Sequence, residues 1–314
     1  MQGCKLVVGV FLGLSGGACI ITGDDTPDDG NLSASGAGDG IGRLLLTVSP
    51  GNGVSGLDPG TALGSLVDGW TVKYEQILVV LGDVKADTVE SQIPLMLTGE
   101  MNYLFDLRQV SPEGVIFKSA ERQVTSVKST GYSTQIPTSR TGLGLATATD
   151  LDLMVKGGYS IYVKGTMTNP KGESCAPDDP ADCSPASKIV FTWGLAVPTN
   201  FSGCDGFTVS DSEDTELTLS IPGDHWFLSG FSADAERTSR QAQWVADADL
   251  DRDGETTVDE LKMIKAGTLF TSGRGYDLNG APIPIMTAYD FLAAQVRTLG
   301  INGVNGCTRA TVIE

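Results

Sequence analysis

Short apolar runs that alternate with polar residues dominate the chain from residue 43 to residue 221. Trp70, Val72 and Tyr74 alternate with polar partners, for example, and Gly, Pro, Asp and Ser separate the runs. A period of two predicts β-strands with one buried face, and turns at this spacing are typical of a sandwich. The runs are Leu44–Val48, Trp70–Tyr74, Ile77–Leu81, Tyr103–Leu107, Val115–Phe117, Val124–Val127, Tyr159–Val163, Ile189–Trp193 and Leu217–Ile221. We therefore predict a mostly β chain with an antiparallel β-sandwich over residues 43–223.

The clearest motif lies in residues 224–314, where the apolar residues change to a helical period. The string D-x-D-x-D-G-x5-E fits the twelve-residue calcium loop of an EF-hand. Its carboxylates, a backbone carbonyl, a hydroxyl or water and a final bidentate glutamate are the hard oxygen ligands that Ca²⁺ takes. In loop order the ligands are Asp249, Asp251, Asp253, Glu255, Thr257 and Glu260, with Gly254 at the sharp turn. We predict a small helical segment with an EF-hand-like loop and Ca²⁺ as its cofactor; a solvated acidic turn between two helices is the alternative.

A sister loop is hard to find in the sequence. Residues 275–280 match the first half of one, but Met286 stands where the final Glu belongs, which indicates a degenerate partner or a plain loop. The eighth loop position usually carries an aliphatic residue that pairs with the sister loop, and here it is Thr256. A single loop in an exported protein favours structural calcium, because extracellular modules bind at about 10⁻⁴–10⁻³ M.

The N-terminus has the features of an export signal. Lys5 precedes an apolar run over residues 6–14, and small residues lead to Cys19. That run is too short to span a bilayer of roughly 30 Å as a helix. We predict a signal peptide over residues 1–18, lipidation of Cys19 and a polar tether over residues 19–42. Gly16 departs from the Leu that lipoboxes usually carry, so simple cleavage after Ala18 is the competing prediction.

Four further cysteines are Cys175, Cys183, Cys204 and Cys307. In an exported chain an even number favours two disulfides, for which three connectivities are possible. Cys175 and Cys183 flank a loop rich in Pro and Asp, so a local disulfide there is natural. Cys204 would then pair with Cys307. Metal binding by these thiols is not expected, since no C-x-x-C pair occurs.

The charge balance restricts the partners of the chain. It has 314 residues with 39 Asp and Glu against 21 Lys and Arg, a formal net charge of −18, and one histidine. The balance argues against nucleic acid, whose phosphates need Lys and Arg, and against an anionic membrane surface. It suits cations, calcium above all, whereas a single His excludes zinc sites built on several imidazoles.

His225 follows Asp224 directly after the last expected strand. The functional interpretation is a second metal site, with His225 and Asp224 as ligands for a transition metal. The alternative is a packed or capping imidazole at the domain junction. No second His completes a usual copper or zinc set.

These features favour an exported, lipid-anchored and non-enzymatic calcium-binding protein, in which the ion stabilises the C-terminal helices. It is expected at the outer membrane, in the periplasm or at the cell surface. The alternative is a periplasmic protein that handles copper or another transition metal through His225. An envelope hydrolase is a third possibility, although no P-loop and no H-E-x-x-H motif occurs. The sequence does not identify a protein or envelope partner.

Several stretches of the mature chain stand out together: Asp68–Tyr74, Leu81–Val84, Gly223–His225, the Asp-rich loop and Tyr289–Cys307. They resemble a loosely defined group of uncharacterised myxobacterial-type lipoproteins, and the resemblance covers most of the mature chain. In that group the end before the final cysteine tends to carry a His, whereas this chain reads LGINGVNG before Cys307. If a family metal site pairs that His with His225, this chain has lost it.

Overall fold

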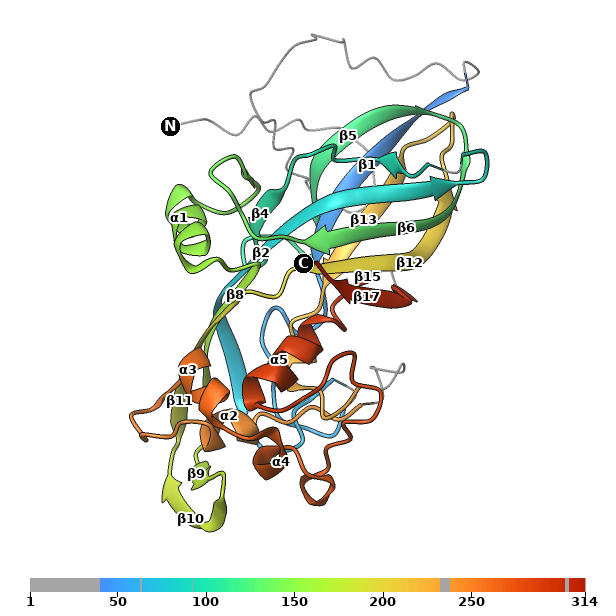
Figure 1. Cartoon of the computed structure of the whole chain (residues 1–314). Coiled ribbons are helices and arrows are strands. Elements are labelled where there is room, and N and C mark those ends of the chain that lie inside the picture. Colours follow the sequence, from blue (N-terminus) through green and yellow to red (C-terminus); the bar gives the residue numbers. More distant parts are fainter. Residues whose placement is uncertain (1–39, 63, 92, 232–237, 303–304, 314) are drawn as a thin grey trace, which may run out of the picture.

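The computed structural model describes residues 40–313, apart from residues 63, 92, 232–237 and 303–304. The predicted signal peptide, Cys19 and most of the predicted tether lie outside these residues. The described chain is mostly β, as predicted, and its strands form curled sheets (Figure 1). Within the same residues, every helix is too short or too polar to cross a membrane.

The first sheet has five strands in the order β16-β15-β13-β1-β5. Strand β1 (Ile41–Pro50) lies between β13 (Thr215–Ile221), to which it is parallel, and the edge strand β5 (Val115–Gln123), to which it is antiparallel. Two short C-terminal strands, β15 (Ile301–Asn302) and β16 (Asn305–Gly306), continue the sheet beyond β13. Residues 301–306 therefore return to the same sheet as the first strand, whereas the last strand, β17 (Arg309–Val312), joins the second sheet.

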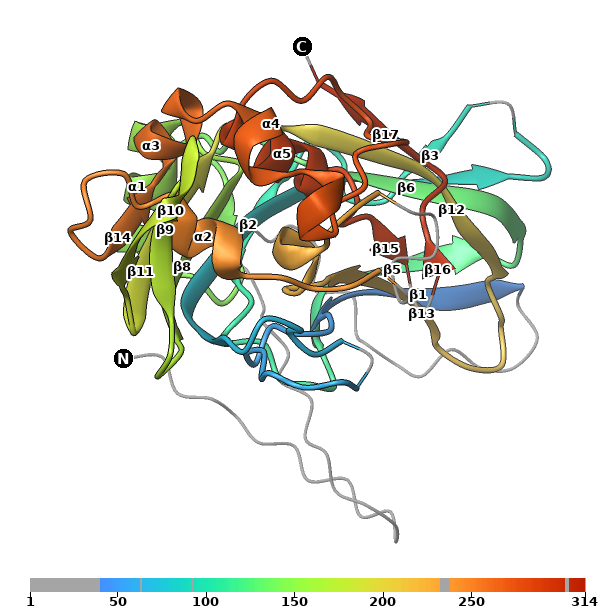
Figure 2. The same cartoon turned by 90° about the horizontal axis from the view of Figure 1, so that it is seen from below.

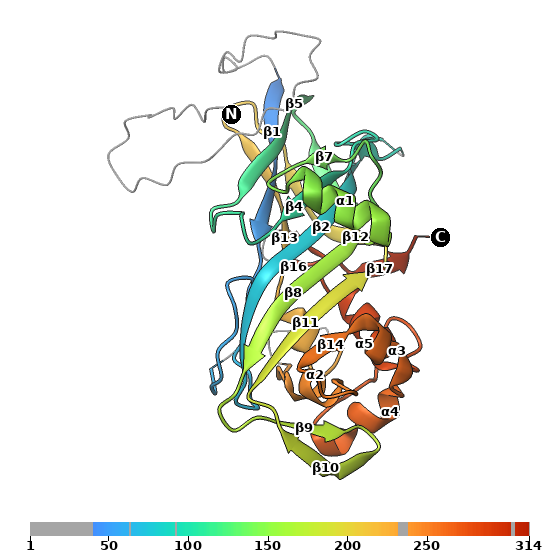
Figure 3. The same cartoon turned by 90° about the vertical axis from the view of Figure 1, so that its left-hand side faces the viewer.

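The second sheet has ten strands, and its main path is β14-β11-β8-β2-β6-β12-β17. The long strand β2 (Thr71–Thr88) lies in the middle of this path, between β8 (Ile161–Thr168) and β6 (Ser126–Thr134). Figure 3 shows β2, β8 and β11 side by side along the length of the molecule. The remaining members are β3 (Leu95–Met96), β4 (Tyr103–Asp106), β7 (Gly142–Leu143), β11 (Lys188–Leu195), β12 (Thr199–Thr208), β14 (Glu255–Thr257) and β17 (Arg309–Val312).

The pairing is mainly antiparallel, but three pairs are parallel: β1 with β13, β4 with β7 and β11 with β14. These parallel pairs differ from the sequence-based prediction, which was a purely antiparallel sandwich. A separate hairpin of β9 (Glu173–Ala176) and β10 (Asp179–Pro185) forms where the sequence suggested a loop.

A helix interrupts the region in which the sequence predicted only strands. Helix α1 (Ala148–Gly157) begins with a capping box, in which Thr147 and Asp150 each accept a hydrogen bond from the other's backbone N–H. It ends at Gly158, whose φ of 63° is left-handed and therefore favours glycine. Met154 is the buried residue of this helix and packs with Leu78 of β2.

The other helices of the described residues are short and lie after β13. They are η1 (His225–Phe227), α2 (Gln243–Asp247), α3 (Val258–Met263), α4 (Ala266–Leu269), η3 (Ser272–Arg274) and α5 (Ala288–Val296). Helix α2 begins at Gln243 and ends at Asp247. Figures 1 and 2 show α4 and α5 next to each other, and both lie in the half of the molecule that also contains the β9–β10 hairpin.

The larger of two hydrophobic clusters in the described residues joins the two large sheets to the helices that follow β13. Trp193 of β11 stacks on Trp244 of α2, with ring centroids 5.5 Å apart and an interplanar angle of 18°. Trp244 also meets Phe291 of α5 edge to face. Aromatic pairs of this kind contribute about 0.5–1.5 kcal/mol beyond the area they bury. Helix α2 is thereby held at a fixed position beside the edge of the second sheet.

Candidate calcium site

The predicted calcium loop, residues 249–260, begins just after α2, contains β14 and ends in the first turn of α3 (Figure 3). Its backbone makes a tight turn at two positions with left-handed φ, which are Arg252 at 59° and Gly254 at 88°. Gly254 accommodates this φ without strain because it lacks a Cβ. The structure thus places the sharp turn at the residue that the motif assigns to it.

The three aspartates of the motif lie close together. One carboxylate oxygen from each of Asp249, Asp251 and Asp253 lies within 4.8 Å of the others. The carboxylate of Asp249 accepts the backbone N–H of Asp253 at 3.1 Å and that of Gly254 at 2.9 Å. Asp251 and Asp253 are exposed, whereas Asp249 is buried.

The electrostatics of the loop favour a cation. Burial raises the pKa of Asp249, and the negative charges of Glu260 and Asp253 raise it further, against the opposing effect of the Gly254 N–H. Grouped carboxylates disfavour one another's ionised form, and an opposite charge within about 4–6 Å reverses this effect. A divalent cation at this position would therefore stabilise all of the carboxylates together.

Glu260 faces the loop from the first turn of α3. One carboxylate oxygen accepts the N–H of Leu250 at 2.9 Å, and the other accepts the N–H and the hydroxyl of Thr257, each at 2.8 Å. Thr257 in turn accepts the N–H of Glu260 at 3.3 Å, which completes a capping box. The last acidic position of the motif is thereby fixed, largely buried, against both ends of the loop.

The residue at the eighth loop position, Thr256, packs against the edge of the second sheet, where an EF-hand pair would have a sister loop. Thr256 is fully buried and lies in β14, which pairs in parallel with β11 at the edge of the second sheet. Its hydroxyl donates to the carbonyl of Val245 at 2.7 Å. The N–H of Val190 in β11 donates to the carbonyl of Gly254 at 2.8 Å. This explains why a hydroxyl is tolerated where the sequence pattern leads one to expect an aliphatic residue.

Residues 275–280 form a different arrangement. The side chain of Asp277 accepts from both the backbone N–H and the side-chain amide of Asn279, at 3.0 and 2.7 Å. The backbone N–H of Asp277 donates to Ser229 at 2.9 Å. Asp277 belongs to neither of the groups of three potential metal ligands found in the described residues.

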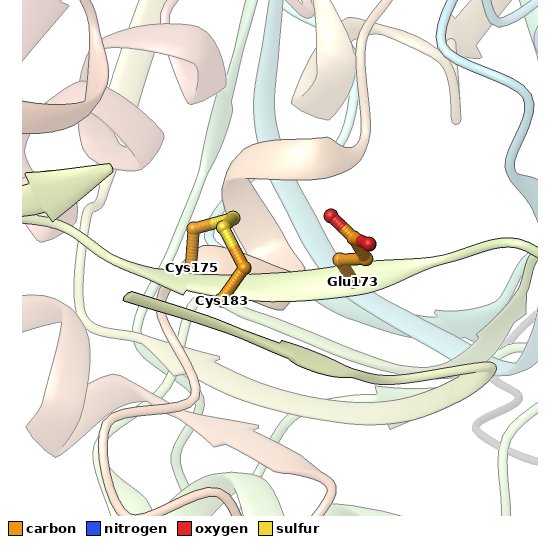
Figure 4. A group of neighbouring side chains, drawn as sticks. All are labelled: Glu173, Cys175 and Cys183. Carbon is orange, nitrogen blue, oxygen red and sulfur yellow. A yellow bond between two sulfur atoms is a disulfide. The ribbon is translucent and has the colours of Figure 1, made fainter. Parts of the chain in front are cut away.

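The cysteines pair as the sequence suggested. Cys175 is bonded to Cys183 across the β9–β10 hairpin, and Cys204 of β12 is bonded to Cys307. Figure 4 shows the first disulfide beside Glu173, the second group of potential ligand atoms in the described residues. Both sulfur atoms are in the S–S bond, whereas a metal binds the free thiolate, so this group is not a metal site.

The disulfide hairpin contacts the calcium loop, which sequence reasoning did not foresee. Arg252 of the loop forms an ion pair with Asp182 of β10 at 2.9 Å. Cys175 donates its backbone N–H to Asp247, at the end of α2, at 3.0 Å. The only sequence signal for these contacts is the opposite charge of the two partners, which selects no single pair in so acidic a chain.

Asp224 and His225, the expected ligands of a second metal site, each contact a different protein side chain. Arg240 donates to Asp224 from Nε and from its terminal nitrogen, both at 2.7 Å, and both side chains are buried. His225 Nδ1 lies 2.8 Å from the hydroxyl of Thr298. Burial lowers the pKa of His225, and Arg240 acts in the same direction, against Asp224. Neither group of three potential ligands in the described residues includes His225.

Comparisons with known proteins add little. No family model matches the chain, and no curated protein matches it. Among solved structures, MbnP from Methylosinus trichosporium matches over 60% of this chain and 77% of its own, with 8% identity and a TM-score of 0.31. A match at this level supports no conclusion about the fold or the function of the chain.

Proposed function

We propose that the chain is an exported protein that binds one Ca²⁺ in the loop of residues 249–260, where the ion has a structural role. The observation that carries this proposal is the convergence of Asp249, Asp251 and Asp253 within 4.8 Å. Glu260 faces the same loop from the start of α3. Glu255 and Thr257 complete the expected oxygen set. Ca²⁺ takes six to eight oxygen ligands, so this donor set suits it better than it suits softer metals.

The structural role follows from where the loop lies. Strand β14 is part of the loop and covers the edge of the second sheet at β11. Repulsion among the carboxylates opposes the tight turn that brings β14 to this edge, and a bound cation removes the repulsion. In this proposal the loop is of the EF-hand type, and the sheet edge takes the place of a sister loop.

We further propose that the two large sheets form a sandwich and that the chain is anchored to a membrane by lipidated Cys19, as in the lipoprotein group that its sequence resembles. Two disulfides support an oxidising compartment outside the cytoplasm. The net charge of −18 supports partners other than nucleic acid. Transition-metal handling at His225 is less favoured, because Arg240 already holds Asp224.

Isothermal titration with CaCl₂ tests the calcium proposal. The chain from residue 20 onward should bind one Ca²⁺, and Asp251→Ala should abolish binding. The matched control is Asp259→Ala, which removes the same charge from an exposed side chain at a non-ligand position. Failure of the wild-type chain to bind Ca²⁺, or equal binding by both variants, would refute the proposal. Parallel elemental analysis after exposure to copper tests the His225 alternative, with His225→Ala as its variant.

A further inference from the structure

A pocket of about 450 Å³ lies along helix α2, and its lining includes both the first residue of this helix, Gln243, and the last, Asp247. Its walls come from four parts of the chain: the loop before β2, the β8–β9 turn together with β9 itself, helix α2 with the residues just before it, and the end of η3 with the residues that follow. The residues that line it are Asp68, Asn169, Lys171, Glu173, Cys175, Gln241, Gln243, Trp244, Asp247, Arg274 and Tyr276. The six ligand positions of the calcium loop are not among them, so the pocket is a separate feature.

Part of the wall is firmly fixed by hydrogen bonds. Asp68 accepts the backbone N–H groups of Ala242 and Gln243 with one carboxylate oxygen, at 2.5 and 2.7 Å. Asp247 accepts from Gln243 at 2.9 Å and from Arg274 at 2.7 Å. These contacts position the pocket before any ligand arrives.

Three of the residues that line the pocket each have a buried polar atom without a hydrogen-bond partner among the described residues. The three atoms are the second carboxylate oxygen of Asp68, the indole N–H of Trp244 and the hydroxyl of Tyr276. The side chains of Trp244 and Tyr276 are more than nine-tenths buried. A buried polar group without a partner is costly, and a molecule that reaches it recovers that cost. Because the atoms are buried, such a molecule has to enter between the flanking side chains.

The kinds of atom define the ligand. Trp244 is a donor only, the carboxyl oxygen of Asp68 is an acceptor, and Tyr276 can be either. A ligand hydroxyl group can accept a hydrogen bond from Trp244 and donate one to Asp68. A ligand with several neighbouring hydroxyl groups can make both hydrogen bonds at once. The amides of Asn169 and Gln241 add further groups that both donate and accept.

Size and charge restrict the ligand further. Asp247 and Arg274 neutralise each other as an ion pair, which leaves Asp68 and Glu173 against Lys171. So nearly balanced a set of charges favours an uncharged ligand. The volume lies in the range of about 300–1,000 Å³ that holds small molecules. We propose that this pocket binds an uncharged polyhydroxylated ligand, a mono- or disaccharide, through Asp68, Trp244 and Tyr276.

The test is a titration of the chain from residue 20 onward, at saturating Ca²⁺, with glucose, galactose, N-acetylglucosamine and maltose. At least one sugar should bind with a dissociation constant of about 1 mM or below, by calorimetry and by Trp fluorescence. Tyr276→Phe removes only the unpartnered hydroxyl, so it should weaken binding about 10-fold without lowering Tm. Asp68→Asn keeps an acceptor for the α2 backbone and should also weaken binding. Tyr162→Phe, outside the pocket, is the matched control.

Three results would overturn the proposal. The first is the absence of binding by every sugar tested. The second is binding that Tyr276→Phe and Asp68→Asn leave as strong as in the control, which would place the sugar elsewhere. The third is binding of glycine or serine, supplied as zwitterions, in place of sugars. Because all titrations contain Ca²⁺ and use none of the loop variants, a negative result here is distinct from failure of the calcium proposal.

Discussion

Calcium should raise the free energy of unfolding by an amount that follows from its affinity. At about 5 mM Ca²⁺ and a dissociation constant of about 10⁻⁴–10⁻³ M, linkage gives about 1.1–2.3 kcal/mol. With an unfolding entropy of about 2.1 cal/mol/K per residue, a chain of about 295 residues shifts its Tm by about 1.6 °C for each kcal/mol. We therefore expect Tm to be about 2–4 °C higher in 5 mM CaCl₂ than in excess chelator, measured by scanning calorimetry.

The choice of variant separates the loss of calcium binding from a loss of intrinsic stability. Asp251 is exposed, and its side chain accepts the N–H of Asp253 at 3.2 Å, so Asp251→Ala should change the Tm in chelator little. The same variant should abolish the rise on adding Ca²⁺. Asp259→Ala should keep the whole rise. A Tm that is the same with chelator and with calcium, or a rise that survives Asp251→Ala, would show that the reasoning from the loop is wrong.

Hydrogen exchange tests where the stabilisation acts. The amide of Val190 donates across the edge of the second sheet to Gly254 in the loop. Calcium should slow the exchange of this amide more than that of amides in β1, which lies in the other sheet. Equal slowing in β1 and β11 would mean that the ion stabilises the whole chain and does not hold the sheet edge in particular.

Replacing both Cys204 and Cys307 with Ser should lower the free energy of unfolding by about 4–5 kcal/mol, because their disulfide closes a loop with a sequence separation of 103 residues. Urea denaturation measures this, and a loss below about 1 kcal/mol would contradict the loop-closure account. Asp224→Ala removes the carboxylate that pairs with the buried Arg240, and it should lower the free energy of unfolding by about 3–5 kcal/mol in the same assay. A loss of only about 0–1 kcal/mol, as for an exposed ion pair, would show that water solvates the arginine. Asp106→Asn should stabilise the fold at neutral pH, since burial raises the pKa of Asp106 above its usual 3.8. The protonated carboxyl of Asp106 stabilises the fold fully below pH 3.8, and this stabilisation is lost as the pH rises through the raised folded pKa. The difference in free energy of unfolding between the variant and the wild type should therefore shrink on acidification. Urea denaturation at several pH values measures this difference, and a difference that stays constant would contradict the argument.

Features that are local in sequence could be predicted best. The cluster of Asp249, Asp251 and Asp253 was predictable because these residues fall within one short segment, and the motif alone assigns the turn to Gly254. The strands β1, β2, β8 and β11 were found because alternation marks a strand with one buried face. Helix α1 was missed even though Thr147 and Asp150 form a capping box, because its short apolar pattern resembles that of the surrounding strands.

Features that depend on residues far apart in sequence were not predictable. The parallel pair of β1 and β13 joins Leu44 to Thr215, and neither strand carries a signal for that partner. The pocket is built from four separate segments, so its unpartnered groups become visible only after folding. The pairing of Arg252 with Asp182 is of the same kind, because many other acids were available to the arginine.

Helix α2 connects the two proposed sites. Asp68, in the pocket wall, holds the first backbone N–H groups of α2, and the helix ends at Asp247, just before Asp249 of the calcium loop. An ion that orders the loop also restrains the end of this five-residue helix, whose side chains Gln243 and Trp244 line the pocket. If both sites bind as proposed, calcium should raise the affinity for the sugar, and the sugar must raise the affinity for calcium by the same factor, because linkage is reciprocal. Titrating each ligand with and without the other measures both factors; a sugar affinity unchanged by calcium would show that the core contacts of Trp244 alone fix the helix.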